Sequence, residues 1–240
     1  MHAWAIKGLP EVRPGDDLGA MLAVDDYEPG DVLVVAHKIV SKSEGALRRL
    51  ADVTPSARAI ELARGHDKDP RHVQVVLDES VAVVRAERGV LICRTHHGFV
   101  CANAGVDASN APDAETLVTL PRDPDASARA LRAALPNRPA VVIADSFGRA
   151  WRHGQCDVAI GIAGLAPVDD WRGRRDTTGR ELHATVIAIA DEVAAAADLV
   201  RDKGSREPAV VVRGLGRYVT DDDGPGAAAL IRPVAEDLFL

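Results

Sequence analysis

The residues best suited to chemistry lie in the segment VVIADSFGRAWRHGQCDVAIG, residues 141–161. The four apolar residues Val141 to Ala144 predict a buried strand that ends at Asp145. Such a strand delivers Asp145 and Ser146 to a turn at its carboxyl end, where α/β sheets usually bind ligands. A short polar connection would then lead to the apolar run 158–162. The segment is equally compatible with an Asp and a Ser that only cap a following helix.

A second polar group follows the apolar run at residues 32–36. The sequence HKIVSKSEG, residues 37–45, places two lysines and two serines directly after this expected strand. Lysine ammonium groups and hydroxyls suit phosphate oxygens. The segment therefore predicts a phosphate-binding loop, although taken alone it favours a solvated basic turn.

A third segment, GFVCANAGVDASN at residues 98–110, is rich in small and turn-forming residues. Such a stretch lets the backbone and Asp107 approach a ligand closely, and the alternative is an Asx-turn at Asp107. Asp107, Asp145 and Ser146 offer two carboxylates and a hydroxyl. These groups suit Mg²⁺ or Mn²⁺, hard cations that prefer oxygen ligands and often bridge to phosphates. Spacing alone does not require the three residues to meet.

Several common catalytic motifs are absent from the sequence. It contains no G-x-x-x-x-G-K-[ST], no complete G-x-G-x-x-G after a strand, no G-x-S-x-G and no H-E-x-x-H. These absences exclude a P-loop and the common hydrolase and zinc-protease signatures. The remaining residues indicate an α/β enzyme that uses a metal and a phosphate.

Composition limits the class of protein further. The chain has 240 residues, of which 47% are hydrophobic and only 3% aromatic, so we expect a core of Val, Ala, Leu and Ile. No run of about 18 apolar residues predicts a membrane span, and the N-terminus does not resemble a signal peptide. Three cysteines without a Cys-x-x-Cys pair favour a reducing cytoplasm. The net charge of −7 argues against nucleic-acid binding.

Helices must help to position these groups, and capping residues in the sequence predict where the helices start. Asp16 or Asp17 should cap a short helix through Leu22. The pairs Thr54-Pro55 and Asp123-Pro124 should each begin a longer helix, because proline suits the first helical position.

A capping box formed by Thr178 and Glu181 predicts a long helix through about residue 203. Together these elements predict an α/β fold with an α+β-like mixed sheet. We expect one integrated catalytic unit over residues 1–240, with two intertwined subdomains as the alternative. The predicted strands cover residues 32–36, 73–77, 81–84, 90–93, 141–144, 158–162 and 209–212.

The chain resembles the coenzyme F420-0:L-glutamate ligase family, also called F420 γ-glutamyl ligase. The likeness extends from about residue 8 to residue 214, and the chain resembles the stand-alone form without a C-terminal reductase-like domain. Four segments carry the resemblance in the family's order: GLPEVRPGDDL (8–18), HKIVSKSEG (37–45), ANAGVDASN (102–110) and ADSFGRAWRHGQCDVAIG (144–161).

The resemblance implies GTP-dependent amide synthesis. GTP would phosphorylate the lactyl carboxylate of F420-0, L-glutamate would attack the acyl phosphate, and later cycles would add γ-linked glutamates. It also implies Mg²⁺ or Mn²⁺ as metal, K⁺ as an additional cation, and a cytoplasmic homodimer with small-molecule substrates. Two alternatives stay open, a metal-dependent phosphohydrolase and a non-catalytic nucleotide-binding subunit.

Carried over by position, the resemblance implies metal binding by Asp107, Asp145 and Ser146, with Asp107, Asp145 and Lys42 as catalytic residues. The chain has His37 where the family is expected to carry Ser, and Asp202-Lys203 where Gly followed by Lys or Gln is expected. No motif selects among the arginines that are candidates for the anionic tail and glutamate: Arg149, Arg152, Arg172, Arg174 and Arg175. The implied nucleotide contacts are Leu9, Pro10, Glu11, Val12, His37, Lys42, Asn110 and Lys203.

Overall fold

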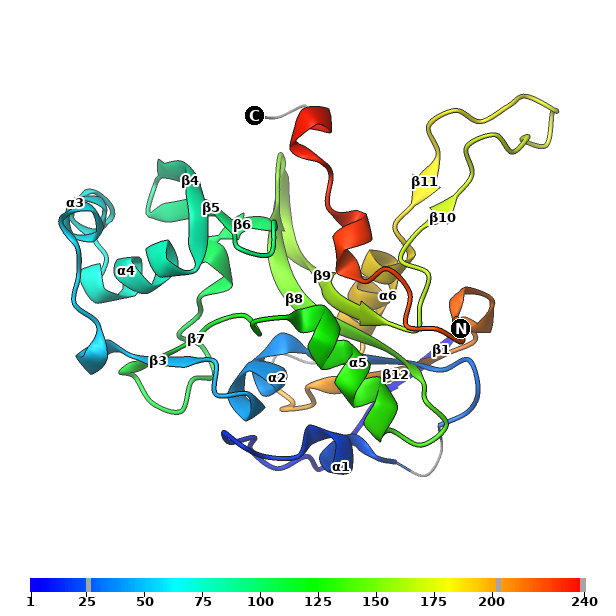
Figure 1. Ribbon diagram of the computed structural model, residues 1–240, viewed down its shortest axis with the longest axis horizontal. Helices are drawn as coiled ribbons and strands as arrows, with labels where there is room; N and C mark the ends of the chain where they lie inside the picture. The colour runs from blue at the N-terminus through cyan, green and yellow to red at the C-terminus, as the bar shows by residue number, and fades with distance from the viewer. Residues whose placement is uncertain (25–26, 202–203, 238–240) are drawn as a thin grey trace.

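A mixed five-stranded sheet organises the fold (Figure 1). The computed structural model describes residues 1–24, 27–201 and 204–237. Strands β2 and β8 are parallel, and every other neighbouring pair in this sheet is antiparallel, which confirms the predicted mixed sheet. The strands follow the spatial order β1 (His2–Ala5), β12 (Ala209–Arg213), β2 (Val32–Ala36), β8 (Ala140–Arg149) and β9 (Arg152–Ala163).

Helices cover both faces of this sheet (Figure 1). Along β2, Leu33 and Val35 pack with helices α1 (Leu18–Leu22), α2 (His37–Ser43) and α5 (Pro124–Ala134). The alternate residues Val32 and Val34 pack against helix α6 (Ile189–Asp198) on the other face. Because a sheet buried on both faces needs apolar residues at successive positions, the central strand β2 and the first half of β8 appear in the sequence as unbroken apolar runs rich in valine.

A glycine permits the close contact between β9 and α5. A Cβ atom added at Gly161 would lie 2.4 Å from the carbonyl oxygen of Pro124, which no side chain tolerates. Asp125 then accepts hydrogen bonds from the amides of Ile162 at 2.8 Å and Ala227 at 2.9 Å. The first turn of α5 is thereby fixed to the sheet and to the C-terminal segment.

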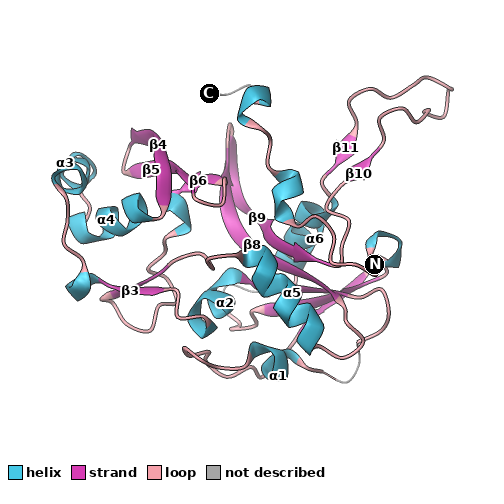
Figure 2. Cartoon of the chain, viewed as in Figure 1, coloured by secondary structure: helices cyan, strands magenta, loops and turns pink. Residues whose placement is uncertain are grey.

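Residues 47–118 form a second cluster of elements between α2 and α5 in the chain (Figure 2). Its ends meet where β3 pairs with β7, and it has its own apolar core around Val73, Val76 and Leu91. It contains β3 (Leu47–Arg49), η1 (Leu50–Asp52), α3 (Ala57–His66), α4 (Pro70–Asp78), β4 (Ser80–Glu87), β5 (Val90–Thr95), β6 (Val100–Ala102), η2 (Asn103–Gly105) and β7 (Thr116–Val118).

The strand predicted at residues 73–77 is wrong, because these residues belong to helix α4. The Asp69 side chain accepts a hydrogen bond from the Arg71 amide, and Pro70 occupies the first turn. An Asp-Pro start therefore outweighs the β propensity of the valines. The Asp-Pro signal is correctly placed at Asp123, which caps α5, and of the two candidates Asp16 and Asp17 it is Asp17 that caps α1.

The start predicted for the long helix, at Thr178, is also wrong, since α6 begins at Ile189. Residues 171–185 instead form an extended arm between β10 (Asp169–Asp170) and β11 (Val186–Ile187) (Figure 1). The Thr178 hydroxyl donates to Asp176 at 2.7 Å, so it is committed to a turn and does not cap a helix.

The C-terminal part that the structure describes contains short 3₁₀ turns. They are η3 (Gly216–Tyr218), η4 (Ala227–Leu230) and η5 (Val234–Glu236). Within the described ranges, no helix has both the length and the apolar character needed to cross a membrane.

Candidate functional site

Strand β8 does not end at Asp145, as predicted, but continues to Arg149. It pairs with β9 as far as Arg149 and Arg152, so the expected short connection is the outer half of a long hairpin. Asp145 and Ser146 lie within the strand, and the alternative of helix capping is also wrong. The inner residues of β8 are buried and the tip is exposed, which shows that ladder pairing, rather than burial, extends the strand.

Residues 37–43 form helix α2, where a loop was predicted. The helix starts directly after β2, and the parallel register that pairs Ala36 with Ala144 sets His37 beside Asp145. His37 Nε2 lies 3.2 Å from Asp145 Oδ1, and His37 Nδ1 lies 3.3 Å from the Ser41 hydroxyl oxygen. The His37 side chain is only 3% exposed, so this contact is held in the interior.

The next residue, Lys38, contacts the other predicted metal ligand. Its ammonium donates to Asp107 Oδ2 at 2.6 Å and to the Ser109 hydroxyl at 2.5 Å. Burial would raise the pKa of Asp107, but the hydrogen bonds from Lys38 and from the Ser109 amide hold that pKa below its ordinary value. The Ser109 amide bond, 2.7 Å, is the Asx-turn named as the alternative for Asp107. The sequence placed Lys38 in the predicted phosphate-binding segment, but no pattern indicated its contact with Asp107.

Asp145 and Asp107 therefore belong to different elements but contact the first two residues of the same helix, α2. The segment that carries Asp107 also packs against β8, because the rings of Phe99 and Phe147 meet edge to face with centroids 6.2 Å apart. The Ser146 amide donates to Asp145 Oδ1 at 2.8 Å. Across residues 1–24, 27–201 and 204–237, no group of three or more His, Cys, Asp or Glu side chains is arranged to hold a metal ion. A cation here would have at most two such ligands.

Lys42 joins α2 to the predicted nucleotide segment 9–12. Its ammonium lies 2.5 Å from Glu11 Oε1, and its side chain is 6% exposed while that of Glu11 is 70% exposed. Within the segment, Val12 is buried in the main core, whereas Pro10 is exposed and Leu9 is half-buried. Glu11 is thus the member of this segment that reaches a basic side chain.

Two predicted nucleotide residues remain, Asn110 and Lys203. Asn110 is exposed and has a left-handed backbone with φ of 57°. Lys203 lies outside the described residues.

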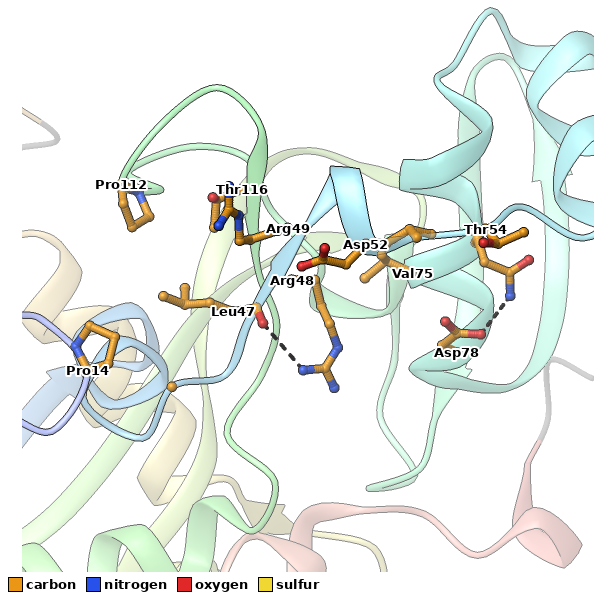
Figure 3. Close-up of a pocket in the computed structure, with 13 residues that line it drawn as sticks. Pro14, Leu47, Arg48, Arg49, Asp52, Thr54, Val75, Asp78, Pro112 and Thr116 are labelled. Carbon is orange, nitrogen blue, oxygen red and sulfur yellow. Dashed lines mark hydrogen bonds between the residues drawn. The ribbon is translucent and has the colours of Figure 1, made fainter.

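A pocket of about 790 Å³ opens beside these segments (Figure 3). Pro14, Gly45 and Pro112 line it, and each follows closely on a predicted nucleotide-contacting segment. The rest of the lining includes Arg48 and other charged side chains from β3, η1 and α4, together with apolar residues such as Leu47 and Val75. Its volume is in the range of small-molecule sites. Asp107, Asp145 and Lys42 do not line it.

The candidate arginines lie on the two projecting segments and bond largely within them. Arg149 donates to the His153 carbonyl at 2.6 Å at the tip of the β8–β9 hairpin. On the arm, Arg172 pairs with Asp170 at 2.5 Å and Arg174 with Asp169 at 3.1 Å. Arg152 begins β9, and Arg175 donates to the Gly179 carbonyl at 2.7 Å. Four of the five candidate arginines thus bond to groups close to them in the sequence.

Asp145 and helix α2 lie where the parallel pairing of β8 with β2 ends, which is where α/β proteins usually bind ligands. The comparisons with known proteins place this chain among the ligases. The family model F420-0:Gamma-glutamyl ligase matches residues 7–214, so the chain belongs to that family. This result confirms the resemblance found in the sequence.

Three relatives show how far the likeness extends. The coenzyme F420:L-glutamate ligase of Methanothermobacter thermautotrophicus is 41% identical over 98% of this chain and 96% of its own length. The protein of the same name from Methanopyrus kandleri is 46% identical over 95% of this chain and 93% of its own. The protein of the same name from Halobacterium salinarum is 46% identical over 89% of this chain and 87% of its own length.

Proposed function

We propose that this protein is a GTP-dependent ligase that joins L-glutamate to the lactyl carboxylate of F420-0. Family membership supports the ligase chemistry and the substrates. One observation carries the proposal at the level of the site. Consecutive residues of α2, His37 and Lys38, contact Asp145 and Asp107 respectively, which brings two carboxylates to the start of a helix that carries two lysines.

The proposed reaction has two steps. A carboxylate oxygen of F420-0 attacks the γ-phosphorus of GTP, and the bond to the GDP oxygen breaks. The amine of L-glutamate then attacks the acyl carbon, the carbon–oxygen bond to phosphate breaks, and the amine loses a proton. Phosphorylation is needed because a free carboxylate is a poor acylating agent. Further cycles on the γ-carboxylate of the added glutamate would extend the chain.

Transfer of a phosphoryl group depends on positioning and on neutralisation of charge. We assign Lys38 and Lys42 to the phosphates, because both ammonium groups project from one short helix and already bind carboxylate oxygens. Because Glu11 contacts Lys42, we assign the segment 9–12 to the same nucleotide. The neighbouring pocket offers room for a ligand of nucleotide size.

The oxygen donors fit a divalent cation. Asp107, Asp145 and Ser146 present only carboxylate and hydroxyl oxygens, and Mg²⁺ is usually bound through one or two carboxylates with waters and substrate phosphates. When bound, Mg²⁺ or Mn²⁺ would supply charge neutralisation at the phosphoryl group. On the resemblance alone, the proposal also includes K⁺, a homodimeric state and a cytoplasmic location.

One assay tests the proposal. Purified protein is incubated with F420-0, GTP, Mn²⁺ or Mg²⁺ and L-glutamate, and products are read by mass spectrometry. We expect glutamyl adducts of F420-0 and an equal amount of GDP for each glutamyl unit added. GTP hydrolysis that does not depend on glutamate would indicate a phosphohydrolase. GTP binding without turnover would indicate a non-catalytic subunit.

A further inference from the structure

The buried imidazole of His37 has an unsatisfied nitrogen beside Asp145. Among the residues that the structure describes, His37 Nε2 is buried and has no hydrogen-bond partner. Asp145 Oδ1 lies only 3.2 Å away, within hydrogen-bond range, so the two groups are misaligned rather than too far apart. A buried polar atom of this kind is costly, and a ligand that it binds is one explanation for it.

The other ring nitrogen determines which lone pair is available. His37 Nδ1 lies 3.3 Å from the hydroxyl oxygen of Ser41, which is buried about one helical turn further along α2. With the proton on Nδ1, the ring donates to this oxygen, and Nε2 presents its lone pair on the side of Asp145. Histidines that bind metals almost always donate their other N–H to a nearby oxygen. The contact with Ser41 therefore suits the tautomer that a metal requires.

The distance between the two groups matches that of two neighbouring ligands of one ion. Metals bind nitrogen and carboxylate oxygen at about 2.0–2.2 Å. Two such atoms at right angles around an octahedral ion lie about 3.0 Å apart, close to the 3.2 Å between His37 Nε2 and Asp145 Oδ1. In this arrangement the lone pair points at the ion and not at the carboxylate oxygen, which accounts for the misalignment.

Asp145 connects this nitrogen to the surface. Its side chain is 16% exposed, whereas that of His37 is 3% exposed, so water and phosphate oxygens can complete the coordination from the side of Asp145. The Ser146 amide donates to Asp145 Oδ1 at 2.8 Å, which holds the carboxylate in place. The parallel pairing of Ala36 with Ala144 fixes α2 beside β8. Both groups are therefore preorganised.

The competing explanation is a plain ion pair between a protonated His37 and Asp145. In that case Nε2–H would be directed at the carboxylate, because charge-assisted hydrogen bonds are short and well aligned. A separation of 3.2 Å without a hydrogen bond does not fit this description.

We propose that His37 Nε2 and Asp145 together bind a divalent cation, with His37 as a nitrogen ligand of the metal. The inference rests on the proposed function, which makes Asp145 a metal ligand. It also changes the expected metal preference, because imidazole suits Ni²⁺ and Zn²⁺, whereas oxygen ligands alone suit Mg²⁺ and Mn²⁺. The family resemblance implied only a nucleotide contact for His37.

The test adds Mn²⁺ to the free protein and measures electron spin echo modulation, which detects nitrogen bound directly to the ion. No nucleotide is present, because guanine nitrogens would give the same coupling. We expect a nitrogen coupling in the wild type and none in His37→Ser, which introduces the residue expected in the family. No coupling in the wild type, a coupling that persists in His37→Ser, or a wild type that binds no Mn²⁺ would each overturn the inference.

Metal affinities measured by titration calorimetry give a second reading. Loss of an outer partner alone weakens metal binding about 10–100-fold, so His37→Ser should raise the Mn²⁺ Kd at least about 10-fold. The variant should raise the Ni²⁺ Kd by a larger factor than the Mg²⁺ Kd, because imidazole suits Ni²⁺. Equal factors for the two metals would contradict a nitrogen ligand.

The matched control is His97→Ser. Among the described residues, His97 Nδ1 is likewise buried without a hydrogen-bond partner, but His97 Nε2 lies 2.9 Å from the carbonyl oxygen of Pro121 rather than beside a carboxylate. This variant should keep the nitrogen coupling and the metal affinities of the wild type. Loss of the coupling in His97→Ser would contradict its assignment to His37.

Thermal unfolding shows whether His37→Ser is folded, and His37→Asn, which keeps a polar side chain, replaces it if it is not. The glutamyl-transfer assay then separates the inference from the proposed function. Glutamyl products from a wild type whose bound Mn²⁺ shows no nitrogen coupling would refute the inference and leave the proposed function intact. A coupling that the His37 variant abolishes, without glutamyl product under any metal, would support the metal site and refute the proposed function.

Discussion

The Lys38 ammonium lies 2.6 Å from Asp107 Oδ2, although the two residues are 69 positions apart in the chain. Lys38 belongs to the first turn of α2, and Asp107 follows the short strand and turn of the second cluster. The contact therefore joins the two cores of the molecule at the point where α2 leaves the main sheet. A cation that binds Asp107 would have to share this carboxylate with Lys38 or displace it.

This contact leads to the first prediction. Lys38→Ala should lower the ligase rate about 100-fold or more, because removal of one preorganised charge from a phosphoryl-transfer site costs that much. Steady-state rates with GTP as the varied substrate give the measurement, and circular dichroism checks the fold. Lys7→Ala removes an exposed lysine next to β1 and serves as the control. Equal rates for the two variants would exclude Lys38 from the phosphate site.

The second prediction concerns Lys42, which the sequence placed in an exposed loop and the structure places in a helix with its side chain 6% exposed. Lys42→Ala should weaken GTP binding about 10–100-fold, since a charged hydrogen bond to phosphate is worth about 1.5–3 kcal/mol. The variant should also lose some thermal stability, because the aliphatic stem of Lys42 is buried. Titration calorimetry and thermal unfolding measure the two effects separately. Unchanged GTP affinity would leave Lys42 with only its structural pairing to Glu11.

A third prediction concerns pH and a pair remote from the site. Arg213 binds Asp31 through two parallel bonds of 2.8 Å, and Asp31 is 1% exposed. Burial would raise the pKa of Asp31, but the hydrogen bonds from Arg213 and the Glu28 amide hold it below its ordinary value. A carboxyl with a depressed pKa in the folded state stabilises the protein above its unfolded pKa, and this contribution is lost as the pH falls through the folded pKa.

Asp31→Asn should accordingly reduce the free energy of unfolding by about 1–3 kcal/mol at pH 7. The difference from the wild type should be constant above about pH 5 and shrink below the unfolded pKa of about 3.9. Urea unfolding of both proteins between pH 3 and pH 8 measures it. A difference that grows as the pH falls would contradict the assigned ion pair.

Local signals predicted much of the fold. The apolar run at residues 32–36 is a strand, and Asp17 and Asp123 cap the helices that follow them. These features depend on a few neighbouring residues, so a single sequence contains them. The same reasoning failed at residues 37–43, where polar side chains suggested a loop although Ile39 and Val40 supply an apolar helical face.

Contacts between residues far apart in the sequence could not be predicted from these local signals. The extension of β8 past Asp145 depends on pairing with β9, and the pairing of Ser146 with Asp157 depends on a bulge in that ladder. The contact of Lys38 with Asp107 requires the whole second cluster to fold back onto α2. The family resemblance implied that Asp107 and Asp145 belong to one site, and the three-dimensional arrangement shows that neighbouring residues of one helix contact them. Their metal-binding role stays a prediction.

The last prediction tests whether Asp107 and Asp145 serve one assembly. Asp→Asn keeps the size of the side chain and removes the charge that would oppose a cation. Each single substitution should lower the rate about 100-fold or more and raise the Mn²⁺ concentration needed for half-maximal activity. Asp107→Asn also removes the counter-charge of Lys38, whereas Asp145→Asn acts beside the buried His37. The control is Asp113→Asn, in the exposed loop before β7.

The double substitution separates one site from two. Groups that act as a unit are not additive, so the double variant should lose much less than the product of the single losses. Effects that multiply would mean that the carboxylates act independently. Full activity of either single variant at limiting Mn²⁺ would remove that residue from the metal site. Asp107 would then keep only its Asx-turn to Ser109, and Asp145 its bond from the Ser146 amide.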